Sequence, residues 1–282
     1  GAQAVTTTMT LGGADAGNYT LSTQPTLTGT ITAKDLNVFS GAVTTKVYDG
    51  TTAAVVTGAV LVGNSTSDTD GKYIGSETVT LGNAGSGTFA DKNIGAGKTV
   101  TTTMTLGGAD VGNYTLLNQP NLTGTILAKD LEVFGAAVPT KVYDGMDSAT
   151  VVGAFLMGNS TSDTDGKYIG SEVVTLGNDT VGSFASKNVG TQAVTTTMTL
   201  GGADAGNYSI SQPNLTGTIF AKDLQVFSAA VTTKVYDGTD SAVVTGAVLV
   251  GNSSSDTDGK YIGTETVTLS GGTSGTFAGK NI

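Results

Sequence analysis

One stretch of the chain, residues 104–115, reads MTLGGADVGNYT, and it returns almost unchanged at residues 9–20 and 198–209. Two further phrases recur in step with it. The phrase KVYDG begins at Lys46, Lys141 and Lys234, and the phrase SDTDGKYIG begins at Ser67, Ser162 and Ser255. The copies are spaced by 93 to 95 residues, which is the length of one small β domain. The sequence therefore predicts a tandem array of one unit.

The unit boundary is placed at the AKDL phrase, which contains Lys34, Lys129 and Lys222. We therefore expect the C-terminal part of a repeat at 1–33, complete repeats at 34–128 and 129–221, and the N-terminal part of a repeat at 222–282. Two interpretations of the partial repeats stay open. Either the chain is a window on a longer array, or partial repeats of neighbouring subunits complete each other in a filament.

Alternating apolar and polar residues predict strands within each repeat, and Gly, Asn and Asp mark the turns. Along residues 99–106, one face carries Val100, Thr102, Met104 and Leu106. The strands predicted for the first complete repeat are 36–39 with 43–48, 54–61, 77–81, a short one at Phe89, 99–106, 113–117 and 122–127. About seven strands without a helix are typical of an Ig-like antiparallel β-sandwich. Because no Gly/Ser-rich or Pro-rich linker separates the repeats, we expect an elongated rod.

The recurring phrase also has the D-x-G-x-Y spacing of a tyrosine corner, in which a turn delivers a Tyr whose hydroxyl bonds back to nearby backbone. In that reading Asp bonds the amides of the turn, and Gly supplies a positive φ. A generic hairpin turn followed by a half-buried Tyr is the alternative. The residues concerned are Asp15 and Tyr19, Asp110 and Tyr114, and Asp204 and Tyr208.

Composition excludes several kinds of chemistry. The 282 residues include 13 basic side chains, all Lys, against 23 acidic ones, and there is no Cys, His or Trp. Without His or Cys there is no Ser-His-Asp or Cys-His nucleophile and no ordinary zinc site. A net charge of −10 repels nucleic acid and anionic lipid. We expect no enzyme, no nucleic-acid partner, no membrane insertion and an extracellular location.

An acidic loop in each copy has part of the spacing of a calcium-binding loop, with acids at positions 3 and 5, Gly at 6 and Glu at 12. Position 1, however, is Thr or Ser, and no helices flank the loop. A solvated Asp-Gly turn is the alternative to Ca²⁺ binding. The candidate ligands are Asp68, Asp70 and Glu77, then Asp163, Asp165 and Glu172, then Asp256, Asp258 and Glu265.

Three weaker candidates concern the surface. An isopeptide bond would need Lys46 or Lys92 beside Asn93 and an acid such as Glu77. The T-x-T spacing of residues 99–105 and 28–32 is compatible with an ice-binding or glycan-binding face, and equally with an ordinary exposed strand. The KVYDG tyrosines are expected to pack at an edge of the sheet, with a role as sugar platforms as the alternative. They are Tyr48, Tyr143 and Tyr236.

These phrases resemble the YDG-type repeat of large bacterial surface proteins, including filamentous-haemagglutinin-like adhesins. The resemblance rests on KVYDGT at 46–51, TFADKNIG at 88–95, GADAGNYTL at 13–21 and TGTIxAK at 28–34. It implies a secreted or cell-surface stalk that carries no catalytic residues. Its partners would be neighbouring repeats, with any host glycan or protein bound at a tip outside this chain. The rivals are a self-assembling filament and a glycan-binding or ice-binding repeat.

Overall fold

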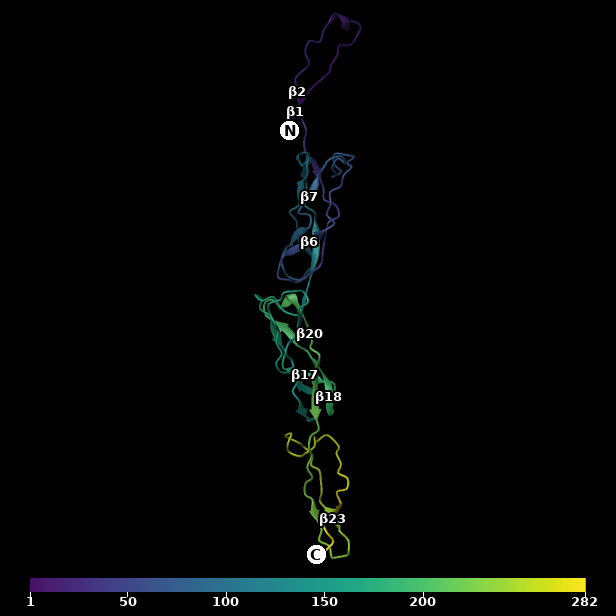
Figure 1. Cartoon of the computed structure of the whole chain (residues 1–282), viewed down its shortest axis with the longest axis vertical. Helices are drawn as coiled ribbons and strands as arrows, with labels where there is room; N and C mark the ends of the chain where they lie inside the picture. Colours follow the sequence, from purple (N-terminus) through teal and green to yellow (C-terminus); the bar gives the residue numbers. More distant parts are fainter. Residues whose placement is uncertain (282) are drawn as a thin grey trace. The chain divides into compact units, whose positions relative to one another are not determined.

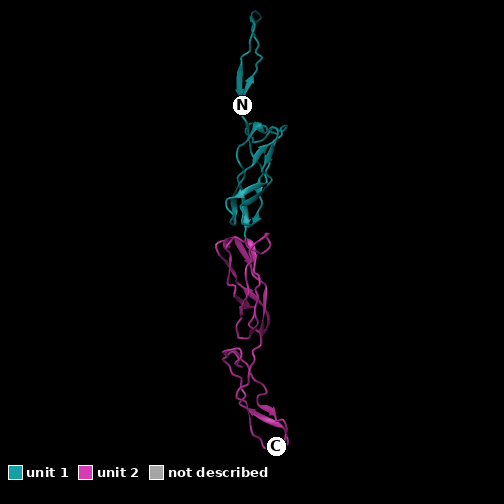
Figure 2. Cartoon of the chain, turned by 60° about the vertical axis from the view of Figure 1, so that its left-hand side comes forward, with its two compact units in different colours: residues 1–128 teal, residues 129–282 magenta. Residues whose placement is uncertain are grey.

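A computed structural model describes residues 1–281, and the chain divides into two compact units, Gly1–Ala128 and Lys129–Ile282 (Figure 2). Each unit contains one complete repeat and one partial repeat. Among the described residues all regular structure is β, apart from three single turns of 3-10 helix. These are η1 (Ala16–Asn18), η2 (Val111–Asn113) and η3 (Ala205–Asn207).

The first unit opens with a hairpin in which β1 (Ala2–Val5) pairs antiparallel with β2 (Leu27–Thr30). The complete repeat follows, and β6 and β7 mark it in Figure 1. Its strands are β3 (Lys34–Leu36), β4 (Ala42–Val43), β5 (Lys46–Val47), β6 (Ala53–Thr57), β7 (Thr80–Gly82), β8 (Ser86–Phe89), β9 (Gly95–Thr101), β10 (Thr105–Gly107), β11 (Tyr114–Leu116) and β12 (Leu122–Leu127).

This repeat is built on a curled, mixed sheet. Six strands pair in the order β4-β6-β8-β9-β12-β5, and two short pairs, β10-β7 and β11-β3, lie outside this sheet. Strand β12 runs parallel to β5, and β11 runs parallel to β3. The expectation that all strands pair antiparallel is therefore wrong, and the sandwich arrangement stays a prediction. The parallel pairs arise because strands from the beginning of the repeat pair with strands from its end. These are β3 with β11 and β5 with β12, and the strands of each pair run in the same direction.

The second unit repeats this plan. Its first ten elements follow the order of the first complete repeat. The parallel pairs are β13-β20 and β14-β21. The larger sheet has five strands, in the order β14-β21-β18-β17-β15. The strands are β13 (Lys129–Glu132), β14 (Lys141–Val142), β15 (Ser148–Thr150), β16 (Thr175–Gly177), β17 (Val181–Phe184), β18 (Gly190–Thr196), β19 (Thr199–Gly201), β20 (Tyr208–Ser211), β21 (Leu215–Phe220), β22 (Ala230–Val231), β23 (Ser241–Thr245) and β24 (Ser274–Thr276). The last three form a separate antiparallel sheet.

Each complete repeat buries equivalent residues. One cluster joins Leu36, Val79 and Tyr114, so that β3 and β11 are held against the segment before β7. The other cluster, seen in the second repeat, comes from the larger sheet. Its buried members are Ala149, Phe184, Val194 and Ile219. Burial of apolar surface in these clusters is the main stabilising contribution that the fold offers.

The predicted strand at 99–106 keeps its inward face but is divided in two. Val100, Thr102 and Met104 are buried as predicted. However, β9 ends at Thr101 and pairs with β12, whereas β10 begins at Thr105 and pairs with β7. Between them the side-chain amide of Gln119 takes the place of a neighbouring strand. It accepts from the Met104 N–H and donates to the Met104 carbonyl, both at 2.9 Å.

The partial repeats bury less. Residues 1–33 contain no buried side chain. Among the described residues of the other partial repeat, 222–281, Ala242 is the only apolar residue that is buried. This contrast separates the two complete repeats, which enclose a core, from the two partial ones.

Candidate functional site

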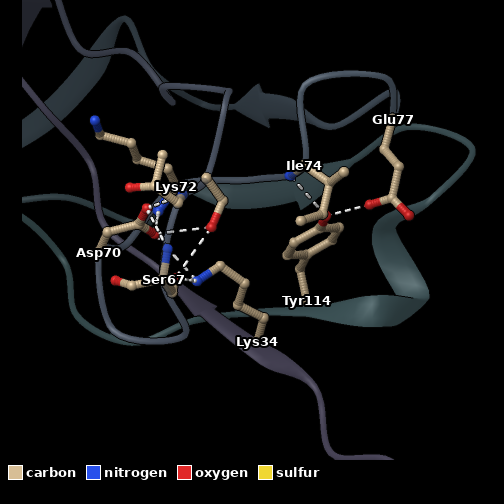
Figure 3. A network of polar contacts seen from close by, with 9 residues as sticks. Lys34, Ser67, Asp70, Lys72, Ile74, Glu77 and Tyr114 are labelled. Carbon is tan, nitrogen blue, oxygen red and sulfur yellow. Dashed lines mark hydrogen bonds and ion pairs between the residues drawn. The ribbon is translucent and has the colours of Figure 1, made fainter.

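A lysine from the first strand of the repeat holds an acidic loop closed (Figure 3). Lys34 Nζ lies 3.1 Å from Asp70 Oδ1 and also donates to the carbonyl of Ser67. The carboxylate of Asp70 accepts three backbone N–H groups as well, from Thr66 at 2.7 Å, Ser67 at 3.3 Å and Lys72 at 3.1 Å. The carboxylate is therefore ringed by donors, and the loop is tied to β3.

The same contact is present in every copy. Lys129 lies 3.0 Å from Asp165, and Lys222 lies 3.2 Å from Asp258. The Lys129 side chain is only 1% exposed, and the side chain of its partner Asp165 is 15% exposed. The pKa of Asp70 is held well below 3.8, first by the Thr66 amide and then by the Lys72 amide and the Lys34 ammonium, against some desolvation. A carboxylate that accepts several N–H bonds is favoured in its charged form.

The structure does not bring together the carboxylates of the calcium prediction. No group of three acidic side chains converges anywhere in residues 1–281. Asp68, Asp163 and Asp256 are exposed. The position-5 acids, Asp70, Asp165 and Asp258, face a lysine ammonium where the hypothesis needs a metal ion.

The glutamates at position 12 have a different partner. In the first complete repeat the Tyr114 hydroxyl donates to Glu77 Oε2 and accepts the Ile74 N–H at 3.0 Å (Figure 3). In the second, Tyr208 makes the equivalent bonds to Glu172 and Ile169. Burying a polar group costs free energy unless the group is hydrogen-bonded. Here the tyrosine hydroxyl bonds both the glutamate carboxylate and the isoleucine N–H.

This geometry corrects the tyrosine-corner prediction. Tyr114 does begin a strand after a tight turn, but its hydroxyl bonds residues about forty positions earlier and not the nearby backbone. The turn's acid also reaches away from its own turn: Asp110 accepts the Thr78 N–H at 2.7 Å, and Asp204 accepts the Val173 N–H at 2.9 Å. The motif therefore ties two distant segments together. In the partial repeat, Tyr19 is 71% exposed, and Asp15 flanks η1 without a side-chain capping bond.

The KVYDG phrase forms a turn closed by its own charges. Lys46 Nζ lies 2.7 Å from Asp49 Oδ1 and donates to the Thr51 and Ala53 carbonyls. The same Asp49 oxygen accepts the Thr51 N–H at 2.8 Å. Gly50 adopts φ +76°, a left-handed conformation that favours glycine. Lys141 with Asp144 and Lys234 with Asp237 repeat the ion pair at 2.8 Å.

The tyrosine of this phrase changes its surroundings from copy to copy. Tyr48 is fully buried, Tyr143 packs partly buried against the sheet cluster, and Tyr236 is largely exposed. Packing is therefore its role in the complete repeats.

The remaining surface candidates are dispersed. Lys46 is bonded to its own turn, the Lys92 ammonium lies 5.8 Å from the centre of the Tyr48 ring, and Glu77 is bound by Tyr114. The threonine row at 99–105 is exposed but interrupted, because β9 and β10 belong to different sheets. No helix in the described part of the chain is long and apolar enough to cross a membrane.

Sequence reasoning missed two side chains. Lys34 marks the repeat boundary in the sequence, and the separation of 36 residues between it and Asp70 recurs for Lys129 with Asp165 and Lys222 with Asp258. That constant spacing was a readable signal. Gln119 was passed over entirely, yet Gln24 and Gln212 bond the equivalent methionines.

Comparison with known families agrees with the repeat structure. The family model described as the YDG domain matches residues 32–122 and again 128–215. No curated protein and no solved structure matches the chain. The two matched ranges cover more than half of the sequence and correspond to the two repeats that enclose a core. The chain therefore belongs to the YDG domain family, and it contains two YDG domains in tandem.

Proposed function

We propose that this chain is a non-catalytic segment of the stalk of a bacterial cell-surface or secreted adhesin. In this proposal the repeats act as successive β-sandwich modules, comparable to Ig-like modules, which form a rod and carry a binding tip away from the cell. The observation that carries the proposal is that two consecutive YDG domains each enclose equivalent core residues and equivalent polar networks.

Two further observations support it. Ala128 alone stands between β12 and β13, so the chain offers no flexible linker at that point. Several charged side chains of the complete repeats also bond their own turns and loops, as Lys46 does with Asp49 and Lys34 with Asp70. Their contacts stabilise the repeat, which supports a structural role.

The stalk predicts that length grows by a constant step for each repeat. Small-angle X-ray scattering would compare the chain with a version in which residues 129–221 are duplicated. The maximum dimension should increase by on the order of 40 Å, from strands of about 8 residues at roughly 3.3 Å each plus end loops. An increase in the radius of gyration without such a step would contradict the stalk.

A second candidate function is self-assembly by complementation of partial repeats, which requires these repeats to expose apolar residues that the complete repeats bury. Leu27 is 41% exposed, whereas its counterpart Leu122 is 7% exposed. Phe277 is likewise 38% exposed against 3% for Phe184. Segments 1–33 and 222–282 therefore expose the kind of apolar surface that the complete repeats bury.

Sedimentation of the full chain over a range of concentrations separates the two functions. Complementation predicts assembly that grows with concentration and is lost in Leu27→Asp, which places a charge at the joining surface. The stalk predicts a monomer at every concentration, with Leu27→Asp no different from the parent.

A further inference from the structure

The second unit contains a polar cluster that joins one repeat to the next. Tyr143 of the KVYDG turn and Lys187 belong to the complete repeat at 129–221, whereas Glu265 belongs to the segment at 222–282. The Tyr143 hydroxyl donates to Glu265 Oε1, and Lys187 Nζ donates to the same oxygen at 2.9 Å. These contacts span 122 and 78 residues of sequence. They are therefore contacts between repeats and not within one.

The cluster has an apolar side as well. Gly145 of the same turn adopts φ +79°, and the place where a Cβ would stand is 3.4 Å from Ile262 Cγ2. The side chain of Ile262 therefore reaches the bare backbone of the turn. Lys187 Nζ also lies 6.0 Å from the centre of the Tyr143 ring, within the range of a cation–π contact.

Glu265 is equivalent to the glutamates that hold the tyrosines of the complete repeats. Glu77 and Glu172 use Oε2 to accept the hydroxyls of Tyr114 and Tyr208 within their own repeat. Glu265 uses Oε1 towards the preceding repeat. The carboxylate of Glu265 thus bonds the preceding repeat, whereas its counterparts bond a tyrosine of their own repeat.

We propose that the KVYDG turn is a docking surface for the following YDG domain, and that the group it binds is the carboxylate of Glu265. The Tyr143 ring is anchored in the sheet cluster of its own repeat, so its hydroxyl is presented at a fixed position. Lys187 supplies the balancing charge. The ion pair alone is worth little because Lys187 is 48% exposed, and the hydroxyl bond to a charged group is the stronger contact.

The ionisation behaviour of the cluster fits this assignment. The Tyr143 hydroxyl and then the Lys187 ammonium lower the pKa of Glu265. The pKa of Tyr143 is raised, chiefly by its bond to Glu265, and the pKa of Lys187 is raised for the same reason. Each of the three groups is thus favoured in the protonation state that maintains the contact.

This docking contact deepens the stalk proposal. It rests on that proposal only for the purpose of the contact, which is to limit bending between repeats. Because the chain has no cysteine, two labels can be placed without side reactions. Val181→Cys and Val243→Cys lie on exposed strand positions, one in the complete repeat at 129–221 and one in the segment at 222–282. Electron paramagnetic resonance then measures the distribution of distances between two spin labels in the full chain.

The parent should give a single narrow distribution. Tyr143→Phe removes the hydroxyl but keeps the buried ring, and Glu265→Ala removes the carboxylate. Each should raise the undocked population by about tenfold, as expected for loss of a hydrogen bond to a charged group. The double variant should be no broader than either single one, since both remove the same bond. Hydrogen exchange at residues 261–265 should quicken in parallel.

Tyr236→Phe is the matched control. It removes the same hydroxyl from the same motif, and Tyr236 is 57% exposed, so the distribution should stay as in the parent. Unchanged widths in both test variants, or an equal broadening in the control, would overturn the docking proposal. The scattering experiment is read separately, since a stalk can lengthen by a constant step whether or not this carboxylate joins the repeats.

Discussion

At the residue scale, the YDG domain satisfies its inward polar groups by pairing side chains that are far apart in sequence. Tyr114 with Glu77 and Lys34 with Asp70 are the two examples in the first complete repeat. Their common effect is to hold the loop at 65–77 against β3 and β11.

Tyr114→Phe is therefore expected to destabilise the first complete repeat by about 1–3 kcal/mol, because it leaves the Glu77 carboxylate and the Ile74 amide without their partner. Urea denaturation followed by circular dichroism measures the change. Tyr19→Phe, at an exposed equivalent position, should leave the transition where it is. Equal shifts in the two variants would argue against the buried bond.

The aspartates of the acidic loops give a pH dependence. The folded pKa of Asp70 lies below its ordinary 3.8, so the bonded carboxylate contributes stability above pH 3.8 and loses it as pH falls through the lower, folded value. The loop at 65–72 should stay ordered at pH 5 and open only in strong acid, as followed by the Asp70 carboxyl chemical shift. Lys34→Met removes one of the donors and should move that titration to higher pH.

At the scale of the strand, the inward face of residues 99–106 was predictable and the break within it was not. Alternation reports which side chains point inward, and Val100, Thr102 and Met104 are buried accordingly. Pairing partners depend on residues elsewhere, here on Gln119 some fifteen positions later. For the same reason the parallel pairs β3-β11 and β5-β12 could not be read from local pattern, because they join the two ends of the repeat. The Lys34–Asp70 contact could have been predicted from the sequence, since the same spacing between a lysine and an aspartate occurs three times.

Gln119→Ala tests the importance of that break. It leaves the buried Met104 N–H and carbonyl unpaired, and we expect a loss of about 1–3 kcal/mol in the free energy of unfolding. Gln24 makes the same bonds to Met9, but there the site is exposed and water replaces the lost amide. Gln24→Ala should therefore cost much less, which differential hydrogen exchange at Met9 and Met104 would show.

At the scale of the whole molecule, complete and partial repeats should differ in their protection. Residues 1–33 contain no buried side chain, whereas Phe89, Val100 and Ile126 in the first complete repeat are almost fully buried. Amide exchange should be fast throughout 1–33 and slow in β9 and β12, because opening free energy follows buried contacts. Strong protection in 1–33 at high concentration would instead favour association through that segment.

The three acidic loops should not depend on calcium. A chelator is expected to leave the thermal midpoint of the full chain unchanged, since Asp70, Asp165 and Asp258 already bind an ammonium and backbone amides. A rise in the midpoint on adding Ca²⁺ would show that the acids find a second arrangement.

The way the lysines are held has a consequence for digestion. A protease that cuts after basic residues must draw a lysine side chain into its own pocket. In this chain every basic residue is a lysine, and those at the turn and boundary phrases already donate to carbonyls and carboxylates of the same repeat. They are Lys34, Lys46, Lys129, Lys141, Lys222 and Lys234. Each of these six cleavage points becomes available only when its turn opens, so cleavage by trypsin-like enzymes at these sites should follow the stability of the fold.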